Sequence, residues 1–535
     1  MRDRAFGWLA TLPLAALLVL LLAPLLRLGW EGWGQGASGG LDQVVPALWR
    51  LWQDDYLRWR LAWSVLQAAV TCVAALALGL PVAWVLARLE FPGRALSLRL
   101  LMLPFVVPTL VAAMGVLALW GPHGLLGGVL GLDLQGTPWL LLYGNLFFNL
   151  CLVVRAGVEA LEQVSARQLA AARSLGATPW RAFWRIEWPA IAPWLASSLC
   201  LVFLYCFAGF GLALVLGGQR YATVEVEIYT LVAHELKLAE ASALALTSLV
   251  LTGGVALLYA GLAQRLAAPT RVEPVPRHAP RGAGQWLALV AALAVLLLVC
   301  AAPLLAIVWR ALLAGPAAWA ELLAPETLAA LWNTLRFSAM ALLLATLLGL
   351  AHALSARAWL PWRAASYLPF VVSPVTVAFG LLLLYPGWTA SLALLLAAYA
   401  VLAYPFVTQS LTAGLDSLPP QLSHAARTLG AGPWRTLWRV TLPLLLPALR
   451  RGMAFAAASA VGEFAVTLFL SRPEWATLTT LIFERLGRPG AANRDAALVL
   501  ACLLMALALL AFVLIDWPAR QRPESHRLPR SPAHA

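Results

Sequence analysis

Two stretches of this sequence are close copies of one another: Ala171–Pro193 reads AARSLGATPWRAFWRIEWPAIAP, and Ala425–Pro447 reads AARTLGAGPWRTLWRVTLPLLLP. They lie 254 residues apart, and 13 of their 23 positions are identical without a gap. Apolar helices can resemble one another by chance because Leu, Ala and Val dominate them. Shared Arg, Trp, Gly and Pro residues are much harder to obtain in that way. The chain therefore contains an internal duplication.

The repeat extends beyond these two stretches. Phe210 matches Phe464 at the same spacing of 254 residues. Upstream, LPFVVP at Leu103–Pro108 resembles LPFVVS at Leu368–Ser373, now 265 residues apart. The difference of 11 residues falls in one intervening loop, which is longer in the first copy. The duplication therefore covers most of two halves of similar length.

Composition indicates that both halves lie in a membrane. Hydrophobic residues make up 62% of the 535 positions and charged residues only 11%, whereas a soluble domain is about a quarter charged. A bilayer-spanning helix needs roughly 20 apolar residues. We predict an all-α polytopic membrane protein with about 12 spans, at roughly 7–28, 61–87, 100–120, 138–157, 193–217, 243–265, 286–309, 331–356, 365–385, 391–411, 448–470 and 496–516.

The stretch Ala268–Gln285 is rich in Pro and Arg and cannot span a membrane. It divides the chain into two halves of six predicted spans. We expect a first half over 1–265, a linker over 266–285, a second half over 286–516 and a tail over 517–535. An even number of spans gives both halves the same orientation, so a translocation path is expected at their interface near the midplane.

Arginines cluster in the short loops that lie on one side of the membrane in this topology. Cytoplasmic loops carry such an excess, so we expect both termini in the cytoplasm of a bacterial cell and the chain in the inner membrane. The net charge of +13 is then explained by the arginines of the cytoplasmic loops. We therefore do not expect a nucleic-acid partner. Four arginines in the last outside loop are exceptions to the rule: Arg472, Arg485, Arg488 and Arg494.

The repeated loops, at about 160–190 and 414–447, have the features of a small helix–turn–helix. A run of small residues ends at Gly176 or Gly430, which suits the left-handed C-cap of a helix. The Pro179 and Pro433 that follow suit the first turn of a second helix. Trp and Arg then recur about one turn apart, on one face. Such a unit is a knob for a partner's groove; the alternative is an amphipathic segment lying on the membrane surface.

Both loops resemble the EAA loop of binding-protein-dependent ABC importers, in which Glu-Ala-Ala, a Gly and Ile-x-Leu-Pro recur at fixed spacing. Ala170 and His424 stand where that family has Glu, Trp188 stands for Leu, and Val440 stands for Ile. The resemblance implies the type I ABC importer permease fold and assigns ATPase docking to both loops. The residues concerned are Ala170, Ala171, Ala172, Gly176, Trp180, Arg181, Arg185 and Pro189, and His424, Ala425, Ala426, Gly430, Trp434, Arg435, Arg439 and Pro443.

Further segments are similar to the fused permeases of thiamine and thiamine pyrophosphate importers, among them Trp52–Leu57, Phe147–Leu150 and Ala222–Tyr229. This resemblance implies a permease that works with two ATPase subunits, a periplasmic solute-binding protein and a small-molecule solute, most simply thiamine. Fused ferric-iron permeases share the two-half plan and are the alternative. ATP and Mg²⁺ would be bound by the ATPase, and no cofactor is expected in this chain.

The sequence contains no GxxxxGK[ST] phosphate-binding loop, so we do not expect this chain to hydrolyse ATP. An ion-coupled secondary transporter with 12 spans is the other class considered. Carriers of the major facilitator type place their charged signature between the second and third spans of each half, whereas here the repeated signal lies between the fourth and fifth.

Three acidic residues are candidates for function. Glu463 falls inside a predicted span, where a charge costs roughly 2.5–3.5 kcal/mol, and Gly209 holds the same position in the first half. We expect Glu463 either to line the path and favour a cationic solute such as thiamine or to be a structural partner for a nearby Arg or hydroxyl. Glu225 and Glu227 alternate with valines outside a span, and they would contact the binding protein or belong to a solvated loop.

Overall fold

The structure is a computed structural model, and it describes residues 4–34, 49, 52–266, 273–356, 360–389, 391–470 and 472–516. The predicted tail 517–535 and positions 267–272 of the predicted linker lie outside these ranges. Within them the chain folds into helices, and 11 are long and apolar enough to cross a membrane, or 12 if one sharply bent pair is counted as a span. The prediction of an all-α protein with about 12 spans is confirmed.

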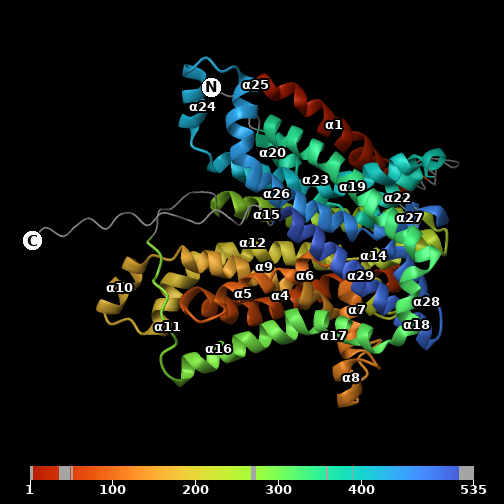
Figure 1. Cartoon of the computed structure of the whole chain (residues 1–535), viewed down its shortest axis with the longest axis horizontal. Helices are drawn as coiled ribbons and strands as arrows, with labels where there is room; N and C mark the ends of the chain where they lie inside the picture. The colour runs from red at the N-terminus through yellow and green to blue at the C-terminus, as the bar shows by residue number, and fades with distance from the viewer. Residues whose placement is uncertain are drawn as a thin grey trace, which may run out of the picture.

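The first half contains six spans and the shorter helices between them (Figure 1). Its elements are η1 (Arg4–Ala10), α1 (Thr11–Leu17), η2 (Leu18–Leu22), α2 (Ala23–Gly34), α4 (Asp55–Arg88), α5 (Arg94–Leu100), α6 (Leu103–Val106), α7 (Thr109–Trp120), α8 (Leu125–Leu130), α9 (Pro138–Glu162), α10 (Ala166–Ser174), α11 (Pro179–Ala182), η4 (Phe183–Glu187), α12 (Trp188–Phe207), α13 (Gly211–Leu216), α14 (Val224–Ala233) and α15 (Leu238–Leu266).

The second half repeats this order. Its elements are α16 (Ala283–Val295), η5 (Leu296–Ala301), α17 (Ala302–Leu313), α18 (Gly315–Ala320), η6 (Glu321–Leu323), α19 (Pro325–Ser355), α20 (Leu360–Ala365), α21 (Leu368–Val371), α22 (Pro374–Leu384), η8 (Pro386–Trp388), α23 (Leu392–Ser417), α24 (Pro420–Thr428), α25 (Pro433–Thr436), η9 (Leu437–Thr441), α26 (Leu442–Val461), α27 (Ala465–Leu470), η10 (Pro473–Trp475), α28 (Leu478–Gly487) and α29 (Ala491–Asp516).

The first span of each half packs against the other half. Leu17 and Leu21 belong to the same buried cluster as Phe337 of α19, and α16 and α17 lie along the first half (Figure 1). The expected division at the linker therefore describes the sequence repeat but does not describe two separately packed units. Burial requires this exchange, because each bundle completes its apolar surface with a helix from the other half.

Glycine permits the exchanged helices to approach closely. A Cβ atom on Gly115 of α7 would lie 2.9 Å from the carbonyl oxygen of Pro303 in α17, and one on Gly380 of α22 would lie 2.9 Å from Pro24 of α2. Gly115 and Gly380 are 265 residues apart, the spacing of the LPFVV repeat. The two contacts are therefore the same contact made twice, and small residues allow helix backbones to meet in this way.

A second pair of equivalent contacts ties the short helices α14 and α28 to the long ones. The Ser64 hydroxyl of α4 accepts a hydrogen bond of 2.8 Å from the backbone N–H of Val224. The Thr334 hydroxyl of α19 accepts one of 2.9 Å from the N–H of Leu478. Each bond satisfies a first-turn N–H that has no partner within its own helix.

The two repeated loops project from one end of the molecule, where α10 and α11 lie apart from α24 and α25 (Figure 1). The described part of the linker lies against the first of them. The N–H of Ala166 donates to the carbonyl of Glu273 over 3.0 Å, and the N–H of Glu90 donates to the carbonyl of His278 over 2.9 Å. The linker thus follows the loop end of the first half and is not a free spacer there.

Candidate translocation site and repeated loops

A cavity of about 250 Å³ lies between the two halves. Both copies of the LPFVV motif line it, through Phe105 and Val107 of the first half and Phe370 and Val372 of the second. The two copies are 265 residues apart in the sequence. Their meeting follows from the packing of the two halves about a shared axis.

The motif lines the cavity because the chain bends there. Proline disfavours helical geometry in the residue before it, and Val107, which precedes Pro108, is extended with ψ 136°. In the second copy Val372 and Ser373 are extended before Pro374, and the helices on either side are bent by 92°. The predicted spans 100–120 and 365–385 are therefore each broken at the level of the cavity and are not continuous helices.

A second pair of breaks lies opposite these bends. Helix α12 ends at Phe207 and α13 begins at Gly211, while α26 ends at Val461 and α27 begins at Ala465. Gly209 and Glu463 hold the same position in these two breaks, and both line the cavity. The carboxylate is thus present on one side of the cavity, and its counterpart on the other side is a glycine.

The Glu463 carboxylate has one hydrogen bond to the protein backbone. Its Oε1 accepts from the N–H of Val466 over 3.1 Å, in the first turn of α27. Among the residues that the structure describes, no arginine or lysine forms an ion pair with Glu463. The carboxylate therefore lines the cavity and caps a short helix. Its hydrogen bond is to a backbone N–H and not to an arginine or a hydroxyl.

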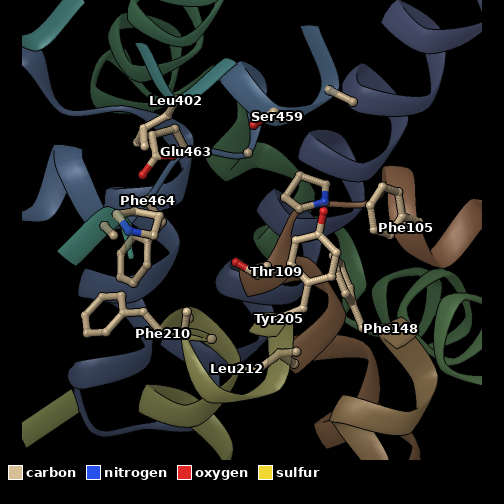
Figure 2. Close-up of a pocket in the computed structure, with 18 of the residues that line it drawn as sticks. Phe105, Thr109, Phe148, Tyr205, Phe210, Leu212, Leu402, Ser459, Glu463 and Phe464 are labelled. Carbon is tan, nitrogen blue, oxygen red and sulfur yellow. The ribbon is translucent and has the colours of Figure 1, made fainter. Parts of the chain in front are cut away.

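Eight aromatic side chains, contributed by both halves, are part of the wall. Figure 2 shows Phe210, Phe464 and Glu463 on one side of the cavity and Phe105, Phe148 and Tyr205 on the other. Among the lining residues, two aromatic contacts cross between the halves. The Phe210 and Phe464 rings are 5.7 Å apart with an interplanar angle of 23°, and Phe105 meets Phe455 edge-on at 6.1 Å. The LPFVV repeat was the signal that could have identified Phe105 and Phe370.

Polar groups in the wall are few. They include Thr109, Asn149, Ser459 and Glu463. The Asn149 amide donates to the carbonyl of Asn145 over 3.0 Å and lies 3.3 Å from the sulfur of Cys206, so it is already held by neighbouring groups. A mostly apolar wall with several aromatic rings and one carboxylate is suited to a solute that combines flat rings with positive charge.

Glu225 and Glu227 are buried, which corrects the expectation that they meet a soluble binding protein. Glu225 accepts hydrogen bonds from Ser248 over 2.9 Å and from Ser373 over 2.5 Å. Glu227 lies 3.2 Å from the Nε of Arg60. The alternation with valine suggested an exposed segment, but the segment is a helix whose neighbours α4, α15 and α22 cover it. Both carboxylates hold helices together.

Each repeated loop contains the predicted short helix and glycine turn. In the first loop the N–H of Gly176 donates to the backbone carbonyl of Arg173, and the N–H of Ala177 donates to the backbone carbonyl of Ala172. This pair of bonds is the Schellman arrangement. Gly430 repeats it, and both glycines have φ of +80°. The residues assigned to docking in both loops are mostly exposed, Trp180 by 70%.

The spans that follow the two loops begin earlier than their predicted bounds of 193–217 and 448–470. The helix is continuous from Pro179 to Phe207, and its five-residue π-helical segment η4 precedes α12. The looser turn accommodates the proline, which cannot donate the regular helical hydrogen bond. Spans five and eleven therefore extend into the loops themselves, and each loop is the end of a transmembrane helix.

Comparisons with known proteins agree with this architecture. Residues 75–308 and 341–521 match the model of the family described as "Binding-protein-dependent transport system inner membrane component". The thiamine transport system permease protein ThiP of Escherichia coli (strain K12) is 29% identical over 87% of this chain and 90% of its own length. The thiamine transport system permease protein ThiP of Brucella abortus (strain 2308) is 28% identical over 97% of this chain and 95% of its own length.

Among solved structures, a bacterial ABC transporter involved in the import of the acidic polysaccharide alginate aligns with a TM-score of 0.40, at 17% identity over 47% of this chain and 92% of that one. The family model covers more than three quarters of the sequence in two separate matches, the first of which runs through the linker to residue 308. The chain belongs to the family of binding-protein-dependent transport system inner membrane components.

Proposed function

We propose that this protein is the complete membrane-spanning unit of an ATP-driven importer of thiamine. The cavity between the halves carries the proposal, because it joins aromatic walls from both halves to the Glu463 carboxylate. Thiamine contains two aromatic rings, one of them a cation, so ring contacts and a carboxylate both favour it. The relatives that match nearly the whole chain are thiamine transport permeases, which supports the same solute.

Two repeated loops on one polypeptide imply two ATPase subunits per chain. Each loop offers a rigid helix with exposed Trp and Arg side chains, of the kind that anchors a protein interface. ATP and Mg²⁺ bind in those subunits and this chain holds no cofactor. The loops then lie in the cytoplasm together with both termini, and a periplasmic binding protein delivers the solute to the opposite end.

The proposal is tested with the complex of this chain, its ATPase and its binding protein in vesicles. We expect thiamine to stimulate ATP hydrolysis and to accumulate inside. Thiamine pyrophosphate carries added negative charge that opposes Glu463, so it is expected to stimulate less at equal saturation of the binding protein. Ferric ion serves as the third solute. Stimulation by ferric ion alone would assign the importer to iron, and uptake without the ATPase would exclude an ATP-driven importer.

A further inference from the structure

The first repeated loop is tied to the second span by a buried ion pair. Arg88 is the last residue of α4, and its Nη2 donates to the Oε1 of Glu187 over 2.7 Å. Glu187 is the last residue of η4, inside the loop. Both side chains are less than a tenth exposed. Removing one member of such a pair strands a buried charge, so the loop and the end of α4 are expected to move together.

The other end of this connection reaches the cavity wall. Helix α4 is 34 residues long, which at 1.5 Å per residue is about 50 Å. In its middle, the buried Gln67 amide donates to the carbonyl of Cys206 over 2.9 Å and accepts from Asn145 over 2.6 Å. Cys206 lies three residues before Gly209, in the turn that leads into the break at the cavity. A displacement of α4 would therefore reach that break directly.

The far end of α4 is fastened as well. The Arg60 guanidinium donates to the carbonyls of Gln219 over 2.7 Å and Arg220 over 3.0 Å, and it pairs with Glu227. These residues connect the break to helix α14. One helix thus holds polar contacts with the loop, with the cavity wall and with the segment beyond it.

At the positions of Glu187 and Gln67, the second half has residues that cannot form the same contacts. Thr441 occupies the position of Glu187, 254 residues later, and a threonine cannot form an ion pair. Aligning Ser64 with Thr334, which make equivalent hydrogen bonds, places Phe337 at the position of Gln67. Phe337 is fully buried in an apolar cluster. The two loops therefore differ in how they are joined to their bundles.

We propose that Arg88 and Glu187 are positioning residues that couple the first loop to the cavity through α4, so that the first half is the main transmitter of ATPase movement. This inference rests on the proposed function, because it assumes an ATPase on the loops. It assigns unequal tasks to two loops whose sequences are nearly the same. The functional quantity that it predicts is the number of solute molecules imported per ATP hydrolysed.

The test compares Glu187→Gln and Arg88→Gln with the matched control Thr441→Val in the whole complex. In both single variants the ATPase is expected to stay bound and to hydrolyse ATP. We expect at least about fivefold less thiamine imported per ATP, because fivefold is the low end of the effects that coupling between two sites produces. The exchange Arg88→Glu with Glu187→Arg is expected to restore much of the ratio. Thr441→Val is expected to leave it unchanged.

A second variant keeps the inference testable if the ion-pair variants fail to assemble. Gln67→Leu lies far from the loop and is expected to lower the same ratio while the ATPase stays bound. If Glu187→Gln imports as much thiamine per ATP as the unaltered complex, the inference is overturned. If Glu187→Gln does not assemble, the same result in Gln67→Leu overturns it. An equal loss in Thr441→Val also overturns it. If the unaltered complex shows no ATP-dependent uptake, the proposed function is at fault instead.

Discussion

Phe210 and Phe464 stack on each other across the interface of the two halves, with their ring centroids 5.7 Å apart. They hold the same position in the two copies of the repeat, so the approximate twofold axis passes near their contact. Phe210 also meets Tyr229 of α14, and Phe464 meets Phe483 of α28. These short helices lie toward the end opposite the loops (Figure 1). The stacked pair is thus the part of the cavity wall that contacts these helices.

Replacing Phe464 by Ala is expected to let thiamine cross vesicles without ATP, because removing a buried ring leaves a gap at this contact. Passive entry of labelled thiamine measures the effect. Phe203 is the matched control, since it stacks on Phe207 within one helix of the first half, and Phe203→Ala should not cause a leak. Equal, undetectable entry in both variants would show that the pair is not part of the barrier.

The charge of Glu463 can be separated from its capping bond. In Glu463→Gln the amide oxygen can still accept from the N–H of Val466, whereas the negative charge is lost. We expect the concentration of binding-protein-bound thiamine needed for half-maximal uptake to rise about tenfold, which is roughly 1.4 kcal/mol, with normal assembly. Glu463→Asp retains the charge, so the concentration for half-maximal uptake should rise less than in Glu463→Gln. Normal uptake by Glu463→Gln would leave the carboxylate with a structural role only.

The exchanged first span depends on a glycine contact. Gly380→Ala would force a Cβ atom against the backbone of Pro24, and overpacking of this kind costs about 1–3 kcal/mol. We expect a lower midpoint in thermal unfolding of the detergent-solubilised protein. Gly253 lies in α15 with open space around its Cβ position, so Gly253→Ala should not lower the midpoint. A similar midpoint for both variants would contradict the tight packing of α2 on α22.

Trp180 is expected to anchor the ATPase subunit at the first loop. The Trp180 side chain is 70% exposed, and its ring meets that of Trp184 edge-on, with the centroids 5.6 Å apart. Truncation of such an anchor costs about 2 kcal/mol or more of binding free energy. Trp180→Ala should weaken binding of the purified ATPase about thirtyfold in a titration. Trp139, 64% exposed at the start of α9, is the control at the opposite end. Unchanged affinity in Trp180→Ala would remove this residue from the interface.

Several features were accessible from the sequence because they depend on neighbouring residues. Apolar segments of sufficient length predict membrane spans, and the glycine turns at Gly176 and Gly430 follow from the positive φ that glycine tolerates. The duplication is likewise visible as a repeated string. The spans and the turns have physical causes within a few tens of residues, and the duplication needs only the comparison of two strings. No knowledge of packing was therefore needed.

Other features were decided only by the tertiary structure, because they join segments far apart in the chain. Composition could not show that α2 packs on α22 of the other half, nor that Gly209 and Glu463 line one cavity. Polarity alone suggested that Glu225 is exposed, whereas Ser248 and Ser373 bury it by supplying hydrogen bonds. The contact of a side chain with a distant helix depends on how the apolar surfaces fit, and local sequence does not encode that fit.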